Sequence, residues 1–334
     1  MTSPVRRYAY AQARVRAWLS RLLTRQQLDT LAAYPDESSL HRELLELGWV
    51  QPTAAVLAAF EDVLWMLEGE PRAVVAAYRV RYECENLGIL LRALERRRSY
   101  DEVAPQLLAV GALGPGRRAE DLLQSATLAD AVARLDSSPF GDALRRQVRA
   151  AAARAQPLDR FRLELVAERD TYEAVWSAVQ ALEGADRSSA AAVLGVELDC
   201  VNLVRAARLR CHHGMSPEEV LAFAIRGGLH LDATRRAVLA HEPVETWAAQ
   251  LASTPYGVAL AAADSPLLEL ELRRIRAHIA ERALSGSPFR IGLVLAYLVL
   301  LEIQAADLQR LIEGRRLGRP EAWLRAGLAT RRGC

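Results

Sequence analysis

A block of this sequence occurs twice, and its spacing limits the folds that the chain can adopt. Residues 83–87 (Glu-Cys-Glu-Asn-Leu) match residues 199–203 (Asp-Cys-Val-Asn-Leu), and the offset of 116 residues holds again between residues 135–144 and 251–260. A weaker third copy, Gln-Ala-Ala-Asp-Leu, begins at residue 304. The distance from one copy to the next, 116 and then 105 residues, is far longer than the period of TPR, HEAT or armadillo modules, which is about 34 to 47 residues. We therefore expect three similar domains, which we place at residues 1–107, 108–222 and 223–334.

The apolar residues follow a helical period along nearly the whole chain. Residues 56–67 show it well, because Val56, Phe60, Val63 and Leu67 fall on one stripe of a helix with 3.6 residues per turn. Sustained alternation of the kind found in strands is absent, and the commonest residues are strong helix formers such as Ala, Leu, Arg and Glu. The sequence predicts an all-α fold.

The sequence indicates a chain that folds in the cytoplasm. The longest apolar run, residues 291–301, ends at Glu302 and is shorter than the ~18 to 20 residues of a membrane-spanning helix. It predicts a buried core helix and no transmembrane segment. Arginines interrupt the first 20 residues, which argues against a signal peptide. The 4 cysteines are too scattered for a disulfide framework, as expected in a reducing compartment.

The charged residues exclude several function classes. The formal net charge is +2, so no long-range field favours nucleic acid, and no basic and aromatic stripe is present. All 43 basic residues are arginine, which excludes a Walker A loop and Schiff-base chemistry, since both need lysine. Cys211, His212 and His213 are adjacent, a spacing that cannot easily direct all three at one metal ion. We expect no metal, no cofactor and no catalytic residues.

Each copy of the repeated block carries a polar residue three positions before an Asn or Asp, on one face of a predicted helix. The residues concerned are Glu83 with Asn86, Asp199 with Asn202, and Asp307 in the third copy. Two interpretations remain open. These residues either form buried hydrogen bonds that join neighbouring helices, since buried polar groups need partners, or they line a central cavity where three equivalent helices converge.

Three stretches of the chain resemble the C subunit of bacterial and archaeal A/V-type ATPases, the homologue of the d subunit in eukaryotic V-ATPases. These stretches are residues 8–23, with Gln-Ala-Arg-Val-Arg-Ala at 12–17; residues 82–93, with Leu-Leu-Arg-Ala at 90–93; and residues 291–320, with Leu-Gln-Arg-Leu-Ile-Glu-Gly-Arg at 308–315. The similarity covers nearly the whole chain, and the order of the motifs is more specific than any one of them.

This resemblance implies a funnel of three similar helical domains about a pseudo-threefold axis. It also implies a non-catalytic component of the central stalk, peripheral on the cytoplasmic face of the membrane and present as a monomer within a hetero-oligomeric complex. Its partners would be the central shaft subunits and the proteolipid c-ring, and its role would be to transmit torque for proton or sodium transport. The third copy departs from the pattern, because it has Asp307 in place of Asn and lacks the later glycine and Ser-Pro-Phe-Gly motifs.

Arginines gather after the motif in each copy, and a threefold arrangement would bring them into one basic ring. The candidates for partner contact are Arg92, Arg96, Arg97, Arg98, Arg205, Arg208, Arg315 and Arg316. Guanidinium groups can bind the carboxylates of a shaft or ring protein bidentately. The alternative is that these arginines are ordinary solvated residues near helix C-termini, where positive charge is favourable.

Two other function classes are possible for an all-α chain with internal repeats. One is a helical-repeat adaptor that binds a different partner, although the copies here are long for such modules. The other is an all-α enzyme of the prenyl-synthase kind, which would need aspartate-rich metal-binding motifs that the sequence lacks.

Overall fold

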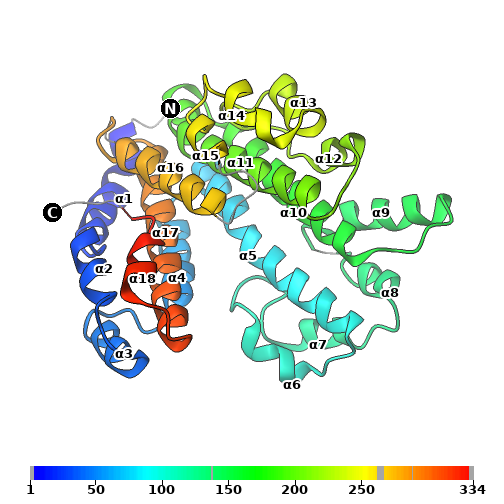
Figure 1. The fold of residues 1–334 in the computed structure, drawn as a ribbon, viewed down its shortest axis with the longest axis horizontal. Coiled ribbons are helices and arrows are strands. Elements are labelled where there is room, and N and C mark those ends of the chain that lie inside the picture. The colour runs from blue at the N-terminus through cyan, green and yellow to red at the C-terminus, as the bar shows by residue number, and fades with distance from the viewer. Residues whose placement is uncertain (1–3, 137, 262–266, 288, 331–334) are drawn as a thin grey trace. The chain divides into compact units, whose positions relative to one another are not determined.

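The computed structural model describes residues 4–136, 138–261, 267–287 and 289–330. Every regular element in these ranges is a helix, as Figure 1 shows, so the all-α prediction is confirmed. The stripe at residues 56–67 is one example, since α4 (Pro52–Met66) buries Val56, Phe60 and Val63.

The chain forms two compact units: unit 1 comprises residues 1–71 and 179–334, and unit 2 comprises residues 72–178. Two helices, α5 (Gly69–Glu95) and α10 (Arg160–Ala181), each cross a boundary between the units. The other helices of unit 1 are α1 (Pro4–Leu19), α2 (Arg25–Leu31), α3 (Glu37–Glu46), α4, α11 (Gly184–Cys211), α12 (Pro217–Phe223), α13 (Ala233–His241), the 3-10 helix η2 (Val244–Thr246), α14 (Trp247–Gln250), α15 (Gly257–Leu260), α16 (Leu267–Leu284), α17 (Ile291–Arg316) and α18 (Glu321–Ala326). The other helices of unit 2 are α6 (Tyr100–Val103), the 3-10 helix η1 (Ala104–Gln106), α7 (Arg117–Leu123), α8 (Leu128–Ala133) and α9 (Gly141–Ala153).

Each copy of the repeated block lies on a long helix. These helices are α5 with 27 residues, α11 with 28 and α17 with 26. In the first two copies the next helix, α6 or α12, starts with the same capping box, in which Ser99 pairs with Glu102 and Ser216 pairs with Glu219. The sequence repeat is therefore also a repeat of local structure. The three domains at 1–107, 108–222 and 223–334 are defined by that repeat, and they stay a prediction.

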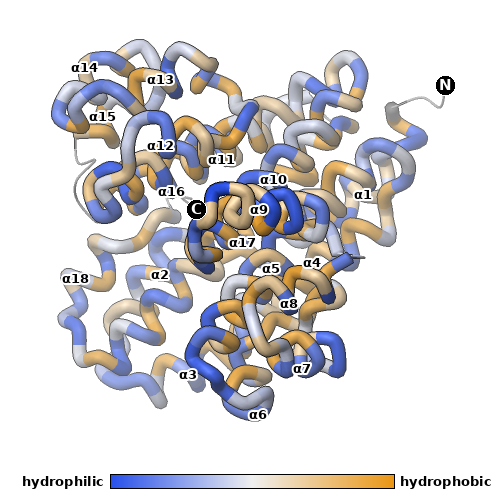
Figure 2. The backbone as a smooth tube through the Cα atoms, turned by 90° about the vertical axis from the view of Figure 1, so that its right-hand side faces the viewer, coloured by the Kyte–Doolittle hydropathy of each residue, from blue (hydrophilic) through white to orange (hydrophobic). Residues whose placement is uncertain are grey.

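The core of unit 1 is built around α17, which packs against α1, α3, α4, α11 and α16. Residues 291–301 are all buried, as the apolar run predicts. Within the described residues α17 is long and apolar enough to cross a membrane, but 89% of its most apolar window is buried by the protein itself, as in a core helix. Along most other helices, orange and blue residues alternate in Figure 2, a pattern typical of helices with one buried face.

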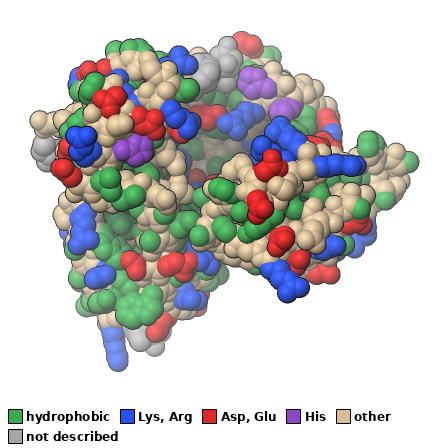
Figure 3. All heavy atoms as spheres, turned by 90° about the horizontal axis from the view of Figure 1, so that it is seen from below, with side chains coloured by type: hydrophobic (Ala, Val, Ile, Leu, Met, Phe, Trp, Pro, Cys, Tyr) green, Lys and Arg blue, Asp and Glu red, His purple; other side chains and the backbone are tan. Residues whose placement is uncertain are grey.

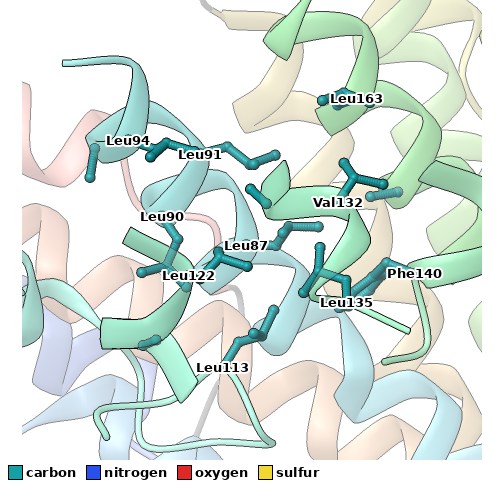
Figure 4. Close-up of a cluster of buried hydrophobic side chains, with 14 of the residues drawn as sticks. Leu87, Leu90, Leu91, Leu94, Leu113, Leu122, Val132, Leu135, Phe140 and Leu163 are labelled. Atoms are coloured by element: carbon teal, nitrogen blue, oxygen red, sulfur yellow. The ribbon is translucent and has the colours of Figure 1, made fainter. Parts of the chain in front are cut away.

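The core of unit 2 is a cluster of leucines, valines, alanines and one phenylalanine. Leu87 and Leu90 of α5 lie beside Leu122 of α7, and Leu91 of α5 and Phe140 before α9 belong to the same cluster (Figure 4). All five side chains are at most 1% exposed. This cluster anchors the second half of α5, which carries the repeated motif.

Replacing Leu87 with alanine tests this anchoring. Leu87→Ala should lower the free energy of unfolding by about 2 to 5 kcal/mol, because it removes apolar contacts and leaves a cavity in a closely packed core. Urea denaturation followed by circular dichroism would measure the loss. Leu45→Ala is the matched control, since Leu45 on α3 is 58% exposed. A loss no larger than that of the control would contradict this packing.

A pH effect follows from Tyr297, which lies in the core on α17 and stacks on Trp18. Burial raises the pKa of Tyr297 to about 12, and the charge of Asp62 adds to the rise. Tyrosine in an unfolded chain has a pKa of about 10. The unfolded state therefore loses this proton first, so the contribution of Tyr297 to stability is complete below pH 10 or so and declines above it, by about 1.4 kcal/mol per pH unit.

Tyr297→Phe should remove this part of the alkaline decline in stability. The measurement is the free energy of unfolding in denaturant at several alkaline pH values, compared with Tyr10→Phe, in which the altered ring is 55% exposed. If the native chain and Tyr297→Phe lost stability equally steeply with pH, the inference about Tyr297 would be wrong.

Candidate functional site

The two repeated asparagines bind the backbone in the same way. Asn86 on α5 donates from Nδ2 to the carbonyl oxygen of Leu108 at 2.8 Å, and its Oδ1 accepts the Leu108 N–H at 2.8 Å. Asn202 on α11 makes the same two hydrogen bonds with Ile225, at 3.0 and 2.8 Å. Both side chains are buried. Each asparagine thus satisfies both polar groups of one residue in a loop that follows its helix.

Asp307 occupies the equivalent place on α17 but uses different chemistry. An ionised carboxylate cannot donate a hydrogen bond, and Asp307 accepts two, from the N–H of Ala329 at 3.0 Å and the N–H of Thr330 at 2.8 Å. Its side chain has no exposed surface. The three copies therefore tie residues 22 or 23 positions downstream to the long helix.

The acidic residue of the motif binds a later part of the same loop. Glu83 accepts the N–H groups of Ala112 at 2.8 Å and Leu113 at 3.2 Å. Gly111 lies directly against this carboxylate, with φ +62°, and a Cβ at that position would be 2.2 Å from Glu83 Oε2. The glycine is needed for its left-handed backbone and for the close approach.

Asp199 makes the corresponding contacts in the second copy. It accepts three backbone N–H groups, those of Leu229 at 3.1 Å, His230 at 2.7 Å and Leu231 at 3.2 Å, and the hydroxyl of Tyr256 at 2.9 Å. Burial raises the pKa of the Asp199 carboxyl, while these hydrogen bonds oppose the rise. Burial also raises the pKa of Tyr256, as does the charge of Asp199. The adjacent glycine here is Gly228, one position later than the repeat predicts.

The third copy lacks this second set of hydrogen bonds in the part of the chain that the structure describes. Gln304 holds the position of Glu83 and Asp199, and it is 2% exposed, but neither atom of its amide has a hydrogen-bond partner. Residues equivalent to those bound by Glu83 and Asp199 would fall after residue 330, outside the described residues. The third copy therefore differs from the first two both in its sequence and in the hydrogen bonds made at this position.

The predicted arginines occupy several different environments. Arg92 pairs with Glu164 at 3.2 Å, and Arg208, its match in the second copy, pairs with Glu269 at 2.6 Å. Arg205 is 5% exposed and donates to the carbonyl oxygen of Phe223 at 2.6 Å, so its guanidinium binds inside the fold.

The remaining candidates lie at the ends of long helices. Arg315 donates to the carbonyl oxygen of Ala32, and Arg316 pairs with Glu313 on its own helix. Residues 96–98, which follow α5, are all exposed. The face shown in Figure 3 mixes arginine and carboxylate side chains, with one local gathering of arginines. Of the predicted arginines, residues 96–98 are exposed and take part in no ion pair within the described residues.

Some structural residues had no clear signal in the sequence. Tyr256 occupies the repeat position of Phe140. Two differences between the copies are the only sequence signals for its hydrogen bond to Asp199: Tyr256 has a hydroxyl that Phe140 lacks, and Asp199 is shorter than Glu83. A buried ion pair joins Arg276 of α16 to Glu197 of α11, with Glu302 of α17 3.7 Å from the same guanidinium, and no repeat marks these residues. Among the described residues, no group of three potential metal ligands lies together.

The contrast between Asn86 and Asp307 predicts the effect of exchanging their side chains. Asn86→Asp should destabilise the chain by about 1 to 3 kcal/mol, because the carboxylate cannot donate to the Leu108 carbonyl oxygen and leaves it unpaired. Asp307→Asn should cost a similar amount, since its amide nitrogen would face a backbone N–H. Chemical denaturation measures both.

Arg149→Gln, at an exposed position on α9, serves as a control for both substitutions. An unfolding free energy for Asn86→Asp equal to that of the native chain would show that the paired hydrogen bonds do not stabilise the fold.

Comparison with known proteins places the chain in a family. The family model described as "ATP synthase (C/AC39) subunit" matches residues 11–326. The C subunit of the A-type ATP synthase of Methanosarcina mazei is 25% identical over 338 residues, which cover 93% of this chain and 89% of the relative. The C subunit of the V-type ATP synthase of Thermus thermophilus is 29% identical over 263 residues, covering 78% of this chain and 76% of the relative. The match to the model spans nearly the whole chain, and the chain therefore belongs to the ATP synthase C/AC39 family.

Proposed function

We propose that this chain is a non-catalytic coupling protein in the central stalk of a rotary A/V-type ATPase or ATP synthase. It would connect the central shaft to the proteolipid c-ring on the cytoplasmic face of the membrane and transmit torque between them during proton or sodium transport. The names of the similar proteins support a component of such a complex. The chain would be one copy within this hetero-oligomer, peripheral to the membrane.

One structural observation favours a mechanical role over a chemical one. Each of the three long helices uses a buried Asn or Asp to hold a loop 22 or 23 residues downstream, through two or more hydrogen bonds. A part that carries torque must resist bending, and close packing with satisfied buried polar groups provides stiffness. In the proposed assembly the three helical domains form a funnel about a pseudo-threefold axis, with the shaft in its mouth.

The partner contact is proposed for the exposed arginines of the first copy. Arg96, Arg97 and Arg98 lie together after α5, and no ion pair within the described residues uses them. Carboxylates on a shaft or ring protein would meet charged, solvent-exposed groups there, which favour rapid and salt-dependent association.

Co-purification with the other rotor proteins tests the function. When the chain is co-expressed with the shaft and proteolipid subunits of its own complex, it should purify with both. Failure to purify with either would contradict the proposal, and turnover of a small substrate by the pure chain would show instead that it is an enzyme.

Reversing the charge of Arg96, Arg97 and Arg98 to glutamate should weaken this assembly at least about tenfold, because several charge-assisted hydrogen bonds are lost. The defect should be larger at low salt than at high salt. The control is Arg149→Glu with Arg154→Glu at the end of α9, which changes exposed arginines of the same unit. Assembly that survives the triple reversal at every salt concentration would exclude this contact.

A further inference from the structure

The C-terminal end of α5 forms one side of a small open pocket of about 90 Å³. Its apolar part is made by Ile89 and Ala93 of α5 and by Val103 of α6. Ala93 and Val103 are 4% and 1% exposed, so this floor belongs to the packed core of unit 2. The volume is sufficient for several water molecules or for one small branched aliphatic group.

The rim of the same pocket is strongly basic. Arg92, Arg96 and Arg98 line it together with Gln106. A pocket that combines an apolar floor with guanidinium groups is suited to a ligand that is apolar at one end and negatively charged at the other.

Nearby carboxylates are already bound to other groups. Glu164 is shared between Arg92 at 3.2 Å and Arg160 at 2.7 Å, and Glu95 pairs with Arg160 at 2.9 Å. Glu102 accepts the backbone N–H of Ser99 at 2.9 Å in the capping box of α6, and this hydrogen bond lowers the pKa of Glu102, with a smaller effect from the charge of Arg98. Hence Arg96 and Arg98 retain guanidinium hydrogen-bonding capacity at the rim.

The end of α5 does not need these arginines as caps. The N–H groups of Arg97 and Arg98 bind the carbonyl oxygens of Leu94 and Ala93, each at 3.0 Å, which is the Schellman arrangement. Arg97 occupies the left-handed position of this turn, with φ +52°. Gly48 and Gly318 hold that position after α3 and α17. Ala155 holds it after α9, with φ +49°, so a side chain is tolerated at this position at a cost of about 1 kcal/mol.

We infer that this pocket binds a carboxylate carried on a small apolar group, as presented by an acidic amphipathic segment of a partner protein. The carboxylate would lie between Arg96 and Arg98, and the apolar group would cover Ile89 and Val103. Inorganic phosphate can bind the arginines of the rim, but it has no apolar group to contact the floor of the pocket. The identity of the partner as a rotor protein rests on the proposed function, whereas the binding chemistry of the pocket does not.

A titration of the isolated full chain with isovalerate tests the pocket directly. Isovalerate should shift the NMR signals of the arginine Nε–H groups at residues 92, 96 and 98 in a saturable way. Acetate, which has the charge without the branched group, should bind several-fold more weakly. Isovaleramide, which keeps the shape without the charge, should cause no saturable shift.

Substitution at the rim separates specific binding from general attraction to arginine. Arg96→Gln combined with Arg98→Gln should weaken isovalerate binding by about tenfold or more. Arg149→Gln combined with Arg154→Gln should leave it unchanged. Binding that is unaffected by the rim variant would overturn the proposal, as would inorganic phosphate or acetate binding as tightly as isovalerate, which would show a simple anion site.

The same rim variant in the assembled complex tests the docking role separately from the proposed function. If Arg96→Gln with Arg98→Gln loses isovalerate binding and also weakens association with the shaft proteins, the partner segment uses this pocket. If the variant loses isovalerate binding but assembles normally, docking at the pocket is wrong and the coupling function stands. If the native chain binds isovalerate but purifies with no rotor protein, the coupling function is wrong and the chemistry of the pocket stands.

Discussion

The fold depends on hydrogen bonds that run from buried side chains of the long helices to the backbone of loops some 22 to 32 residues later. A loop crossing an apolar core carries N–H and C=O groups that are costly to bury without partners. These partners are supplied by Asn86, Asn202 and Asp307, which hold equivalent positions on the three long helices. Without them the buried backbone groups after η1, α12 and α18 would lose their hydrogen-bond partners.

One structural problem is solved by different side chains in different copies. The amides of Asn86 and Asn202 both donate and accept, whereas the carboxylate of Asp307 accepts from two successive N–H groups. Glu83 reaches two N–H groups, while the shorter Asp199 collects three and adds a tyrosine hydroxyl. The shared requirement is that the backbone be satisfied, and each copy meets it with the geometry available locally.

The arginines, which are the chain's only basic residues besides histidine, also satisfy backbone groups inside the fold. Several guanidinium groups bind backbone carbonyl oxygens: Arg205 that of Phe223, Arg25 that of Arg325, and Arg274 that of Ala326. A guanidinium offers five donors in a fixed plane, so one side chain can satisfy more than one acceptor. A cluster of arginines in this chain therefore does not by itself indicate a surface for a partner. Arg96 and Arg98 differ because they line an open pocket and take part in no ion pair within the described residues.

The sequence alone determined the helical class, the buried role of residues 291–301 and the positions of the repeated polar residues. These features depend on local periodicity and on residue type, which are readable from neighbours along the chain. Tertiary structure decided which backbone groups Asn86 and Asp199 bind, that Gly228 lies against Asp199, that Arg205 points inward, and that side chains between residues 89 and 106 line an open pocket. Each of these depends on where a later segment returns to a helix, and that path is set by packing of the whole unit, which no short segment specifies.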